Sequence, residues 1–208
     1  MADSDRARVT PATVDDVDPV TDLWIALAES QRAFGSTLLA EGNRGAVREW
    51  VARSVVTGEL LVARAGDGDP IGFVGFALDH GGYERDRTRG VVSNLFVVPE
   101  RRDEGIGADL LDAAERALRE TGAETVALEA LAANERAREF YAAHGYEPHR
   151  VELRKSLATD DGAGDADGRG EGGDERNDGR GEGGDERNDG RGAGDADGRG
   201  AGDDDPID

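Results

Sequence analysis

The chain has 208 residues, a formal net charge of −21 and no cysteine. Without cysteine neither disulfides nor thiolate metal sites can form, and the three histidines show no metal-ligand spacing, so we expect no metal. Such negative charge argues against nucleic acids and anionic membranes as partners. We find neither an apolar leader nor an apolar run of about 18 residues, which a membrane span needs, and we therefore expect a cytoplasmic protein.

Hydrophobic periodicity predicts alternating strands and helices along the first 157 residues. The first half is expected to start with a strand, continue with two helices separated by a glycine-bearing loop, and end in a β-hairpin. The hairpin turn is the sequence Gly66-Asp-Gly-Asp-Pro70, a strong turn signal. The predicted elements are a strand at 7–10, helices at 15–33 and 46–57, and strands at 59–64 and 71–79.

The second half is expected to hold a strand, a long amphipathic helix, a further strand and a shorter helix. After these, the alternation from Val151 to Leu157 predicts a final edge strand that closes the sheet. The predicted elements are a strand at 89–97, a helix at 105–121, a strand at 125–131, a helix at 135–144, and two closing strands near Tyr146 and at 150–157.

The most informative stretch is the run from Leu95 to Gly107, Leu-Phe-Val-Val-Pro-Glu-Arg-Arg-Asp-Glu-Gly-Ile-Gly. An apolar strand is followed there by a proline turn and by two glycines that open the long helix. The N–H groups of a first helical turn lack intrahelical partners, and the helix dipole adds positive charge to them. Gly105 and Gly107 carry no Cβ, so a phosphate can approach the backbone closely. The run therefore predicts a cradle for a phosphorylated cofactor.

Two common nucleotide-binding loops do not fit this run. A dinucleotide fingerprint needs a third glycine where Leu110 stands, and a Walker A loop needs a Gly-Lys-Ser/Thr sequence that is absent. The pattern that remains is Arg102-x-x-Gly105-x-Gly107. For so short a pattern, a plain strand-turn-helix junction with glycines for tight packing is the alternative interpretation.

A second segment, residues 126–146, narrows the interpretation. Its alternating apolar residues predict a strand, and Asn134 suits the N-cap of the helix that follows. That helix carries Phe140 and Tyr141 and is stopped by Gly145. Together with the glycine pair about thirty residues earlier, this segment resembles the two sequence blocks of the GNAT N-acetyltransferase superfamily. The resemblance covers roughly residues 6–157.

The resemblance implies an α/β chain with the GNAT-like acyl-CoA N-acyltransferase fold, a mixed sheet with helices on both faces in the order β-α-α-β-β-β-α-β-α-β-β. It also implies acetyl-CoA as cosubstrate. In the family, the strand before the loop pairs with the pantetheine arm, and the loop with the first helical turn binds the diphosphate. The residues thus expected to bind the cofactor are Leu95, Phe96, Val97, Arg102, Asp103, Glu104, Gly105, Ile106, Gly107, Ala108 and Asn134.

Acetyl transfer requires that the amine lose a proton and that the departing thiolate gain one. Tyr141 follows Asn134 by seven residues, as the family's general acid does, and a phenol is protonated at neutral pH. A core aromatic is the alternative for Tyr141. The family's common base position holds Ser93. Glu129, placed like the base of enzymes that acetylate ribosomal-protein N-termini, is the expected base, with a water chain as the alternative.

We therefore expect an acetyl-CoA-dependent N-acetyltransferase that acts by direct transfer. The expected partner is a primary amine, either a protein N-terminus or a small molecule, and the protein is expected to be a monomer or homodimer. By family analogy the segments 31–45 and 79–90 line the acceptor side. A non-catalytic acyl-CoA-binding regulatory module is the alternative, supported by the missing carboxylate at Ser93.

Residues 159–208 differ sharply from the rest of the chain. They hold six arginines against 18 acidic residues, and the eleven-residue unit that starts at Asp167 is repeated from Asp178. Such a segment buries too little apolar surface to offset the entropy of ordering. We expect a GNAT domain at 1–158 and a disordered acidic tail at 159–208 that acts as a solubility or interaction arm.

The excess of acidic residues is not confined to the tail. Residues 1–158 carry a formal charge of −9, and Lys155 is the only lysine of the chain. Acidic, lysine-poor surfaces keep proteins dispersed where salt screens their repulsion. The composition resembles that of salt-adapted cytoplasmic proteins such as those of haloarchaea, and an ordinary soluble acidic protein is the alternative.

Overall fold

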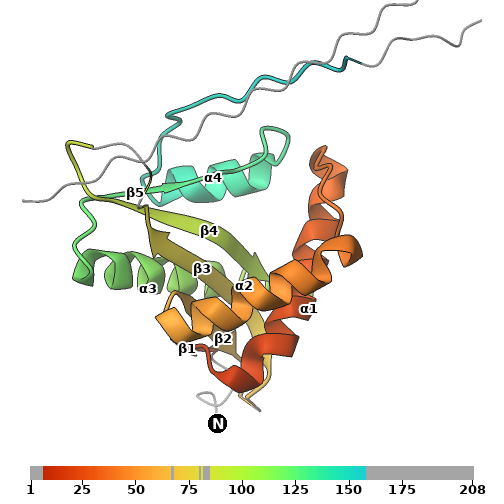
Figure 1. Ribbon diagram of the computed structural model, residues 1–208, viewed down its shortest axis with the longest axis vertical. Helices are drawn as coiled ribbons and strands as arrows, with labels where there is room; N and C mark the ends of the chain where they lie inside the picture. Colours follow the sequence, from red (N-terminus) through yellow and green to blue (C-terminus); the bar gives the residue numbers. More distant parts are fainter. Residues whose placement is uncertain (1–6, 67, 80, 82–84, 158–208) are drawn as a thin grey trace, which may run out of the picture. The chain divides into compact units, whose positions relative to one another are not determined.

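The computed structural model describes residues 7–66, 68–79, 81 and 85–157, so the tail expected at 159–208 lies outside the described residues. The chain divides into two units, residues 1–152 and 153–208. All helices and strands of the described residues belong to the first unit (Figure 1). In the second unit, the described residues 153–157 form neither helix nor strand.

A five-stranded sheet in the order β1-β2-β3-β4-β5 forms the centre of the first unit (Figure 1). The first four strands are antiparallel neighbours, whereas β5 runs parallel to β4. Parallel neighbours need a crossover connection, which a helix supplies here. The strands are β1 (Arg8–Pro11), β2 (Leu60–Arg64), β3 (Pro70–Leu78), β4 (Arg89–Val97) and β5 (Thr125–Leu128).

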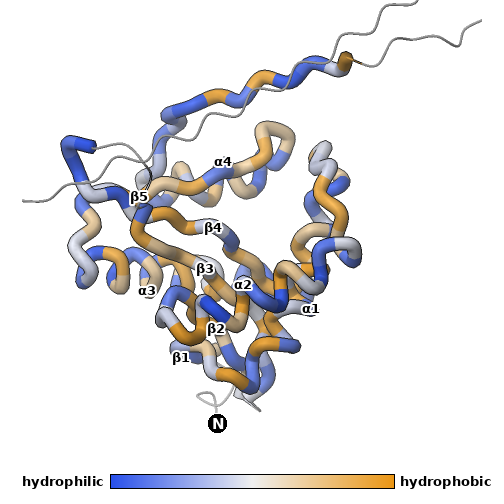
Figure 2. Tube along the Cα trace, viewed as in Figure 1, coloured by the Kyte–Doolittle hydropathy of each residue, from blue (hydrophilic) through white to orange (hydrophobic). Residues whose placement is uncertain are grey.

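Helices cover both faces of the sheet. The α-helices are α1 (Val17–Gln31), α2 (Arg44–Thr57), α3 (Ile106–Glu120) and α4 (Glu135–Ala143), and short 3-10 turns span Val14–Asp16, Arg32–Phe34, Glu41–Asn43 and Pro99–Arg101. One hydrophobic cluster joins α1 and α2 to the sheet, and a second joins α3 and α4 to its other side. Figure 2 shows apolar residues along β3 and on part of β4. No described helix has the length and apolar composition that spanning a bilayer requires.

The strand β4 changes face halfway along its length. Val92 lies in the cluster under α3, whereas Phe96 lies in the cluster under α1 and α2. Residues four apart in a regular strand share a face, so the strand must contain an irregularity. Gly75 pairs with Asn94, and the next residue of β3 pairs with Val92, which leaves Ser93 as an extra residue. Ser93 therefore forms a β-bulge, which bends the strand.

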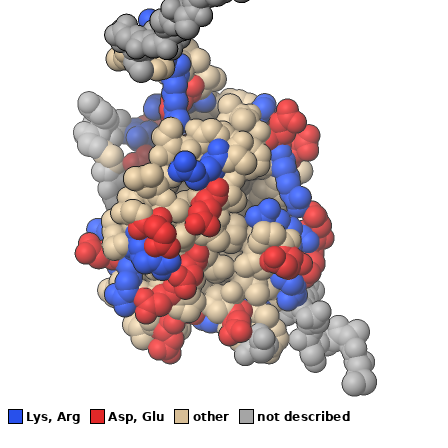
Figure 3. All heavy atoms as spheres, turned by 90° about the vertical axis from the view of Figure 1, so that its right-hand side faces the viewer, with Lys and Arg blue, Asp and Glu red and all other residues tan. Residues whose placement is uncertain are grey.

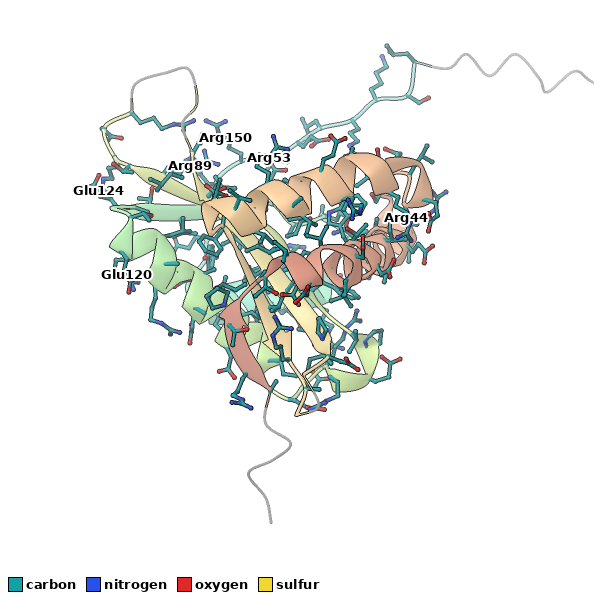
Figure 4. The ribbon with its side chains drawn as sticks, turned by 60° about the horizontal axis from the view of Figure 1, so that its bottom comes forward. Arg44, Arg53, Arg89, Glu120, Glu124 and Arg150 are labelled. Carbon is teal, nitrogen blue, oxygen red and sulfur yellow. The ribbon has the colours of Figure 1, made fainter. Side chains whose placement is uncertain are left out.

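Beyond the bulge, β4 and β5 part. Their parallel pairing runs from Arg89 opposite Thr125 to Val92 opposite Leu128 and ends there. Figure 4 shows Arg89 and Glu124, beside the starts of the two strands, at the same end of the sheet. From Ser93 onward, the edge of β4 that faces away from β3 has no partner strand within the described residues. The sheet is thus open on this side.

The predicted α/β fold class is confirmed, and most predicted elements differ from the observed ones by only one or two residues at each end. The strand predicted at 125–131 ends at Leu128, because the bulge carries β4 away and leaves residues 129–131 without a partner. The two closing strands predicted near Tyr146 and at 150–157 are wrong, since residues 146–157 form neither helix nor strand. Val151 and Leu153 are 82% and 90% exposed. Alternation alone does not make a strand when no neighbouring strand pairs with it.

Candidate active site

A small hollow lies where β4 and β5 part. The bulge of β4, the end of β5, helix α4 and the last turns of α1 all contribute side chains to it. The structure therefore brings both predicted catalytic residues to the same place as one residue of the predicted cofactor-binding strand. The lining residues are Leu27, Gln31, Val92, Ser93, Asn94, Leu95, Leu128, Glu129 and Tyr141.

Helix α2 packs tightly against the bulge beneath this hollow. A Cβ atom on Gly75 would lie 2.7 Å from Cζ2 of Trp50 and 3.0 Å from Oγ of Ser93. The first distance is too short for two carbon atoms and the second is tight, so any larger residue would displace the indole. Glycine at this position therefore lets Trp50 lie directly against β3 beside Ser93.

Glu129 directly follows β5 and its side chain is exposed to solvent while it lines the hollow. It lies just beyond the strand rather than within it, because β5 ends at Leu128. The position two residues before Leu95, where the resemblance leads one to expect a carboxylate, holds Ser93 in the same hollow. Glu129 thus supplies a carboxylate to the hollow in which Ser93 occupies the position of the expected one.

Tyr141 is held by aromatic contacts on two sides. Its ring meets Phe140 edge-on at 5.2 Å and Tyr146 edge-on at 5.8 Å between ring centroids. The hydroxyl of Tyr146 in turn donates a hydrogen bond of 2.8 Å to Glu115 of α3. Burial raises the pKa of the Tyr141 phenol above its ordinary value of 10. The phenol therefore stays protonated at neutral pH and is able to donate a proton into the hollow.

The predicted phosphate cradle has the expected backbone geometry. Gly105 adopts a left-handed conformation with φ of 83°, which glycine allows at no steric cost. The first intrahelical hydrogen bond of α3 runs from the N–H of Asp109 to the Gly105 carbonyl, at 3.0 Å. Helix geometry thus leaves the N–H groups of Ile106, Gly107 and Ala108 without intrahelical acceptors. These donors, at the positive end of the helix dipole, suit an anion.

Arg102 turns toward the protein rather than away from it. Its Nε donates a hydrogen bond of 3.1 Å to the Val97 carbonyl, and its guanidinium carbon lies 5.7 Å from the centre of the Phe96 ring. The Phe96 side chain is buried on the side of α1 and α2, so the predicted cofactor contact of this residue is limited to its backbone. Arg102 therefore braces the turn between β4 and α3, and its phosphate contact stays a prediction.

Each acidic residue of the predicted cradle has an arginine partner. Asp103, with φ of 65°, is the one non-glycine residue of left-handed conformation among the described residues, and its carboxylate lies 2.7 Å from Nη2 of Arg136 in α4. Glu104 lies 2.9 Å from Nε of Arg101. The sequence did not predict the contact of Arg136 with Asp103, because the two residues are 33 positions apart. The only signal was that Arg136 lies four residues before Phe140 and so shares its helix face.

Two residues of the second sequence block have clear structural roles. The Oδ1 atom of Asn134 accepts a hydrogen bond of 3.1 Å from the N–H of Ala137, so the predicted N-cap is confirmed. Nδ1 of His144 lies 2.7 Å from the Phe140 carbonyl at the end of α4. The contact of Asn134 with a pantetheine arm stays a prediction. Among the described residues, no three acidic or histidine side chains gather into a group able to hold a metal ion.

Comparison with known proteins places this geometry among acetyltransferases. The model of the acetyltransferase (GNAT) family matches residues 24–146. A GCN5-related N-acetyltransferase from Ralstonia eutropha JMP134 is 26% identical, with a TM-score of 0.59 and coverage of 73% of this chain and 98% of that one. No curated protein matches the sequence.

Two further solved structures share the fold at lower identity. An aminoglycoside N-acetyltransferase in complex with CoA is 16% identical, with a TM-score of 0.58 and coverage of 76% of this chain and 99% of that one. The NatC complex bound to Gag peptide and CoA is 18% identical, with a TM-score of 0.59 and coverage of 73% and 91%.

Proposed function

The chain belongs to the GNAT acetyltransferase family, and we propose that it transfers the acetyl group of acetyl-CoA directly to a primary amine, of either a protein N-terminus or a small molecule. The observation that carries this proposal is the hollow at the parting of β4 and β5. A carboxylate, Glu129, and a protonated phenol, Tyr141, line it together with Leu95 from the open edge of β4. Direct transfer needs this combination of a base, an acid and a place for the thioester.

The first turn of α3 and the open edge of β4 fit the two halves of the cosubstrate. Three N–H groups from Ile106 onward point at an anion such as the diphosphate. Beyond Ser93, the edge of β4 that has no partner strand in the described part of the chain offers backbone groups to the amides of a pantetheine arm, as in strand addition. When bound, acetyl-CoA supplies a thioester whose carbonyl carbon accepts the amine.

The two titratable side chains of the hollow divide the proton transfers. Glu129 accepts the proton that the amine loses as the new carbon–nitrogen bond forms, either directly or through a water molecule. Tyr141 donates its hydroxyl proton to the sulfur as the carbon–sulfur bond breaks. Burial keeps the Tyr141 pKa above 10 and so preserves that proton at neutral pH.

Both a protein N-terminus and a small molecule are proposed as the source of the amine. Among structures that share the fold, one is an aminoglycoside N-acetyltransferase and another is bound to a peptide, so the fold accommodates both kinds of acceptor. The spacing of Glu129, Asn134 and Tyr141 resembles that of enzymes that acetylate protein N-termini. An α-amine, with an ordinary pKa near 8, also needs less help from a base than a lysine does.

A mass-spectrometric screen tests the proposal. The full-length protein is incubated with acetyl-CoA and panels of peptides and small amines, and an acetylated product is expected. Glu129→Gln is expected to lower kcat on the best acceptor by roughly a hundredfold, as the loss of a general base does. Glu120→Gln, an exposed position at the end of α3 (Figure 4), is the matched control and is expected to keep full activity.

Binding of acetyl-CoA without any acetylated product would contradict the proposal. It would favour the acyl-CoA-binding regulatory module, which the serine at position 93 supports. Equal turnover of Glu129→Gln and the unaltered protein would instead retain acetyl transfer but remove Glu129 as the base.

A further inference from the structure

Helix α4 meets the phosphate cradle at two separate points. Its Arg136 lies 2.7 Å from the carboxylate of Asp103, two residues before Gly105. Its Phe140 ring lies 3.6 Å from the position that a Cβ on Gly107 would occupy. Because residues four apart share one face of a helix, Arg136 and Phe140 both face the N-terminus of α3. The Arg136 guanidinium therefore lies beside the N-terminal turn of α3.

The pair between Asp103 and Arg136 is exposed, with side-chain exposures of 82% and 63%. Exposed ion pairs contribute little to stability, so this one is easily exchanged for a stronger partner. A phosphate group is such a partner, because a guanidinium donates paired, charge-assisted hydrogen bonds to it.

The position of Arg136 is poor for helix stability alone. It stands in the first turn of α4, where the helix dipole disfavours a cation. Asp103 adopts a positive φ of 65°, which aspartate tolerates better than most non-glycine residues. The cation in the first turn of α4 is thus the locally unfavourable choice, and its place beside the cradle favours a binding contact over a purely structural one.

This inference rests on the proposed function. We propose that Arg136 binds the cosubstrate: its guanidinium releases Asp103 and donates hydrogen bonds to a phosphate group of acetyl-CoA. Asp103 holds the guanidinium at the cradle in the free protein. Before binding, the Arg136 guanidinium contacts Asp103 in the loop before α3, and after binding it contacts the nucleotide. This change of partner links the cradle to α4, the helix that carries Tyr141.

Steady-state kinetics with two donors test this contact. Acetyl-CoA carries phosphate groups, whereas S-acetylpantetheine has the same thioester and none. Arg136→Gln is expected to raise the KM for acetyl-CoA about tenfold, the size of one charge-assisted hydrogen bond, and to leave the kinetics with S-acetylpantetheine unchanged. Arg138→Gln, with the same charge change on α4, is the matched control and is expected to leave both unchanged; Arg138 contacts the Ala132 carbonyl.

A double variant separates direct contact from mere neutralisation of Asp103. If Arg136 touches phosphate, Arg136→Gln raises the acetyl-CoA KM in the Asp103→Asn background as well, and Asp103→Asn alone lowers that KM. No effect of Arg136→Gln in that background would overturn the proposal, as would equal losses with both donors, which would mean that Arg136 only positions α4. If the unaltered protein uses neither donor, the proposed function itself fails.

Discussion

Tyr141 is the side chain on which turnover is expected to depend most. The residue lines the hollow, and aromatic contacts hold its ring without needing its hydroxyl. Tyr141→Phe is therefore expected to leave the thermal unfolding temperature nearly unchanged and to lower kcat by about a hundredfold. Unaltered kcat in this variant would show that the proton for the sulfur comes from elsewhere.

The pH dependence of that acid follows from its pKa. Burial raises the Tyr141 pKa above 10, so the protonated form persists through the neutral and mildly alkaline range and is lost only at higher pH. The kcat of the unaltered protein is expected to show no loss of a required acid between about pH 7 and pH 9. A decline of kcat within this range that Tyr141→Phe abolishes would contradict the raised pKa of Tyr141.

Asp16 ties the start of α1 to the sheet. Its carboxylate accepts hydrogen bonds from the Thr13 backbone at 2.6 Å and from both terminal nitrogens of Arg64 in β2, at 2.8 and 2.6 Å. The carboxylate is buried, with an exposed fraction of 3%. Burial by itself raises the Asp16 pKa, but hydrogen bonds from Arg64 and Thr13 outweigh it and hold that pKa below 3.8.

The variant Asp16→Asn is expected to lower the free energy of unfolding by about 2 to 3 kcal/mol, less than for a fully buried pair because Arg64 is partly exposed. Since the folded-state pKa is depressed, this stabilisation is present above pH 3.8 and is lost as pH falls through the lower folded-state value. Urea unfolding at several pH values measures it. Asp18→Asn, which breaks an exposed pair with Arg48, should change stability little, and equal losses would contradict the account.

The element order could be predicted from the sequence because each strand and helix carries its own periodicity. The bounds of β4 at 89–97 agree with the prediction, and the long helix differs from it by one residue at each end. The bulge at Ser93 could not be predicted, because it is a feature of how β4 pairs with β3 and not of β4 alone. The closing strands failed for the same reason, since an alternating segment such as 150–157 says nothing about whether a neighbour pairs with it.

The site shows the same division between local and spatial signals. The helix start at the glycine pair and the cap at Asn134 are local patterns, and both are confirmed, whereas phosphate binding by the cradle stays a prediction. The pairing of Asp103 with Arg136 and the inward turn of Arg102 arise from contacts between separate elements. Such contacts require the fold, and for Arg136 the sequence offered no signal beyond its spacing of four residues from Phe140.

Charge shapes the molecule as a whole. Figure 3 shows acidic and basic side chains interleaved on one face, and exposed pairs such as Arg44–Asp22 and Arg48–Asp18 link α2 to α1. Such pairs do not remove the net charge of −21, which repels an anionic cosubstrate in dilute buffer. The KM for acetyl-CoA is therefore expected to fall as KCl rises from about 0.1 M to about 1 M. A KM that stays flat or climbs would contradict salt adaptation of this site.

The segment 159–208 is proposed as a solubility arm. A chain that ends at residue 158 keeps every residue of the hollow and the cradle, so its kcat and KM at high salt are expected to equal those of the full chain. Its solubility in dilute buffer is expected to fall, because it loses a net charge of −12. Altered kinetics in the shortened chain would instead assign the segment a role at the site.

The central claim is that backbone N–H groups at the start of α3 hold the diphosphate of acetyl-CoA. Isothermal titration calorimetry of the full-length protein with acetyl-CoA, in about 1 M KCl where repulsion is screened, tests it most directly. The account predicts saturable binding of one molecule per chain, weakened when Gly105→Val strains the left-handed turn. No heat of binding from the unaltered protein, or equal affinity of Gly105→Val, would contradict it.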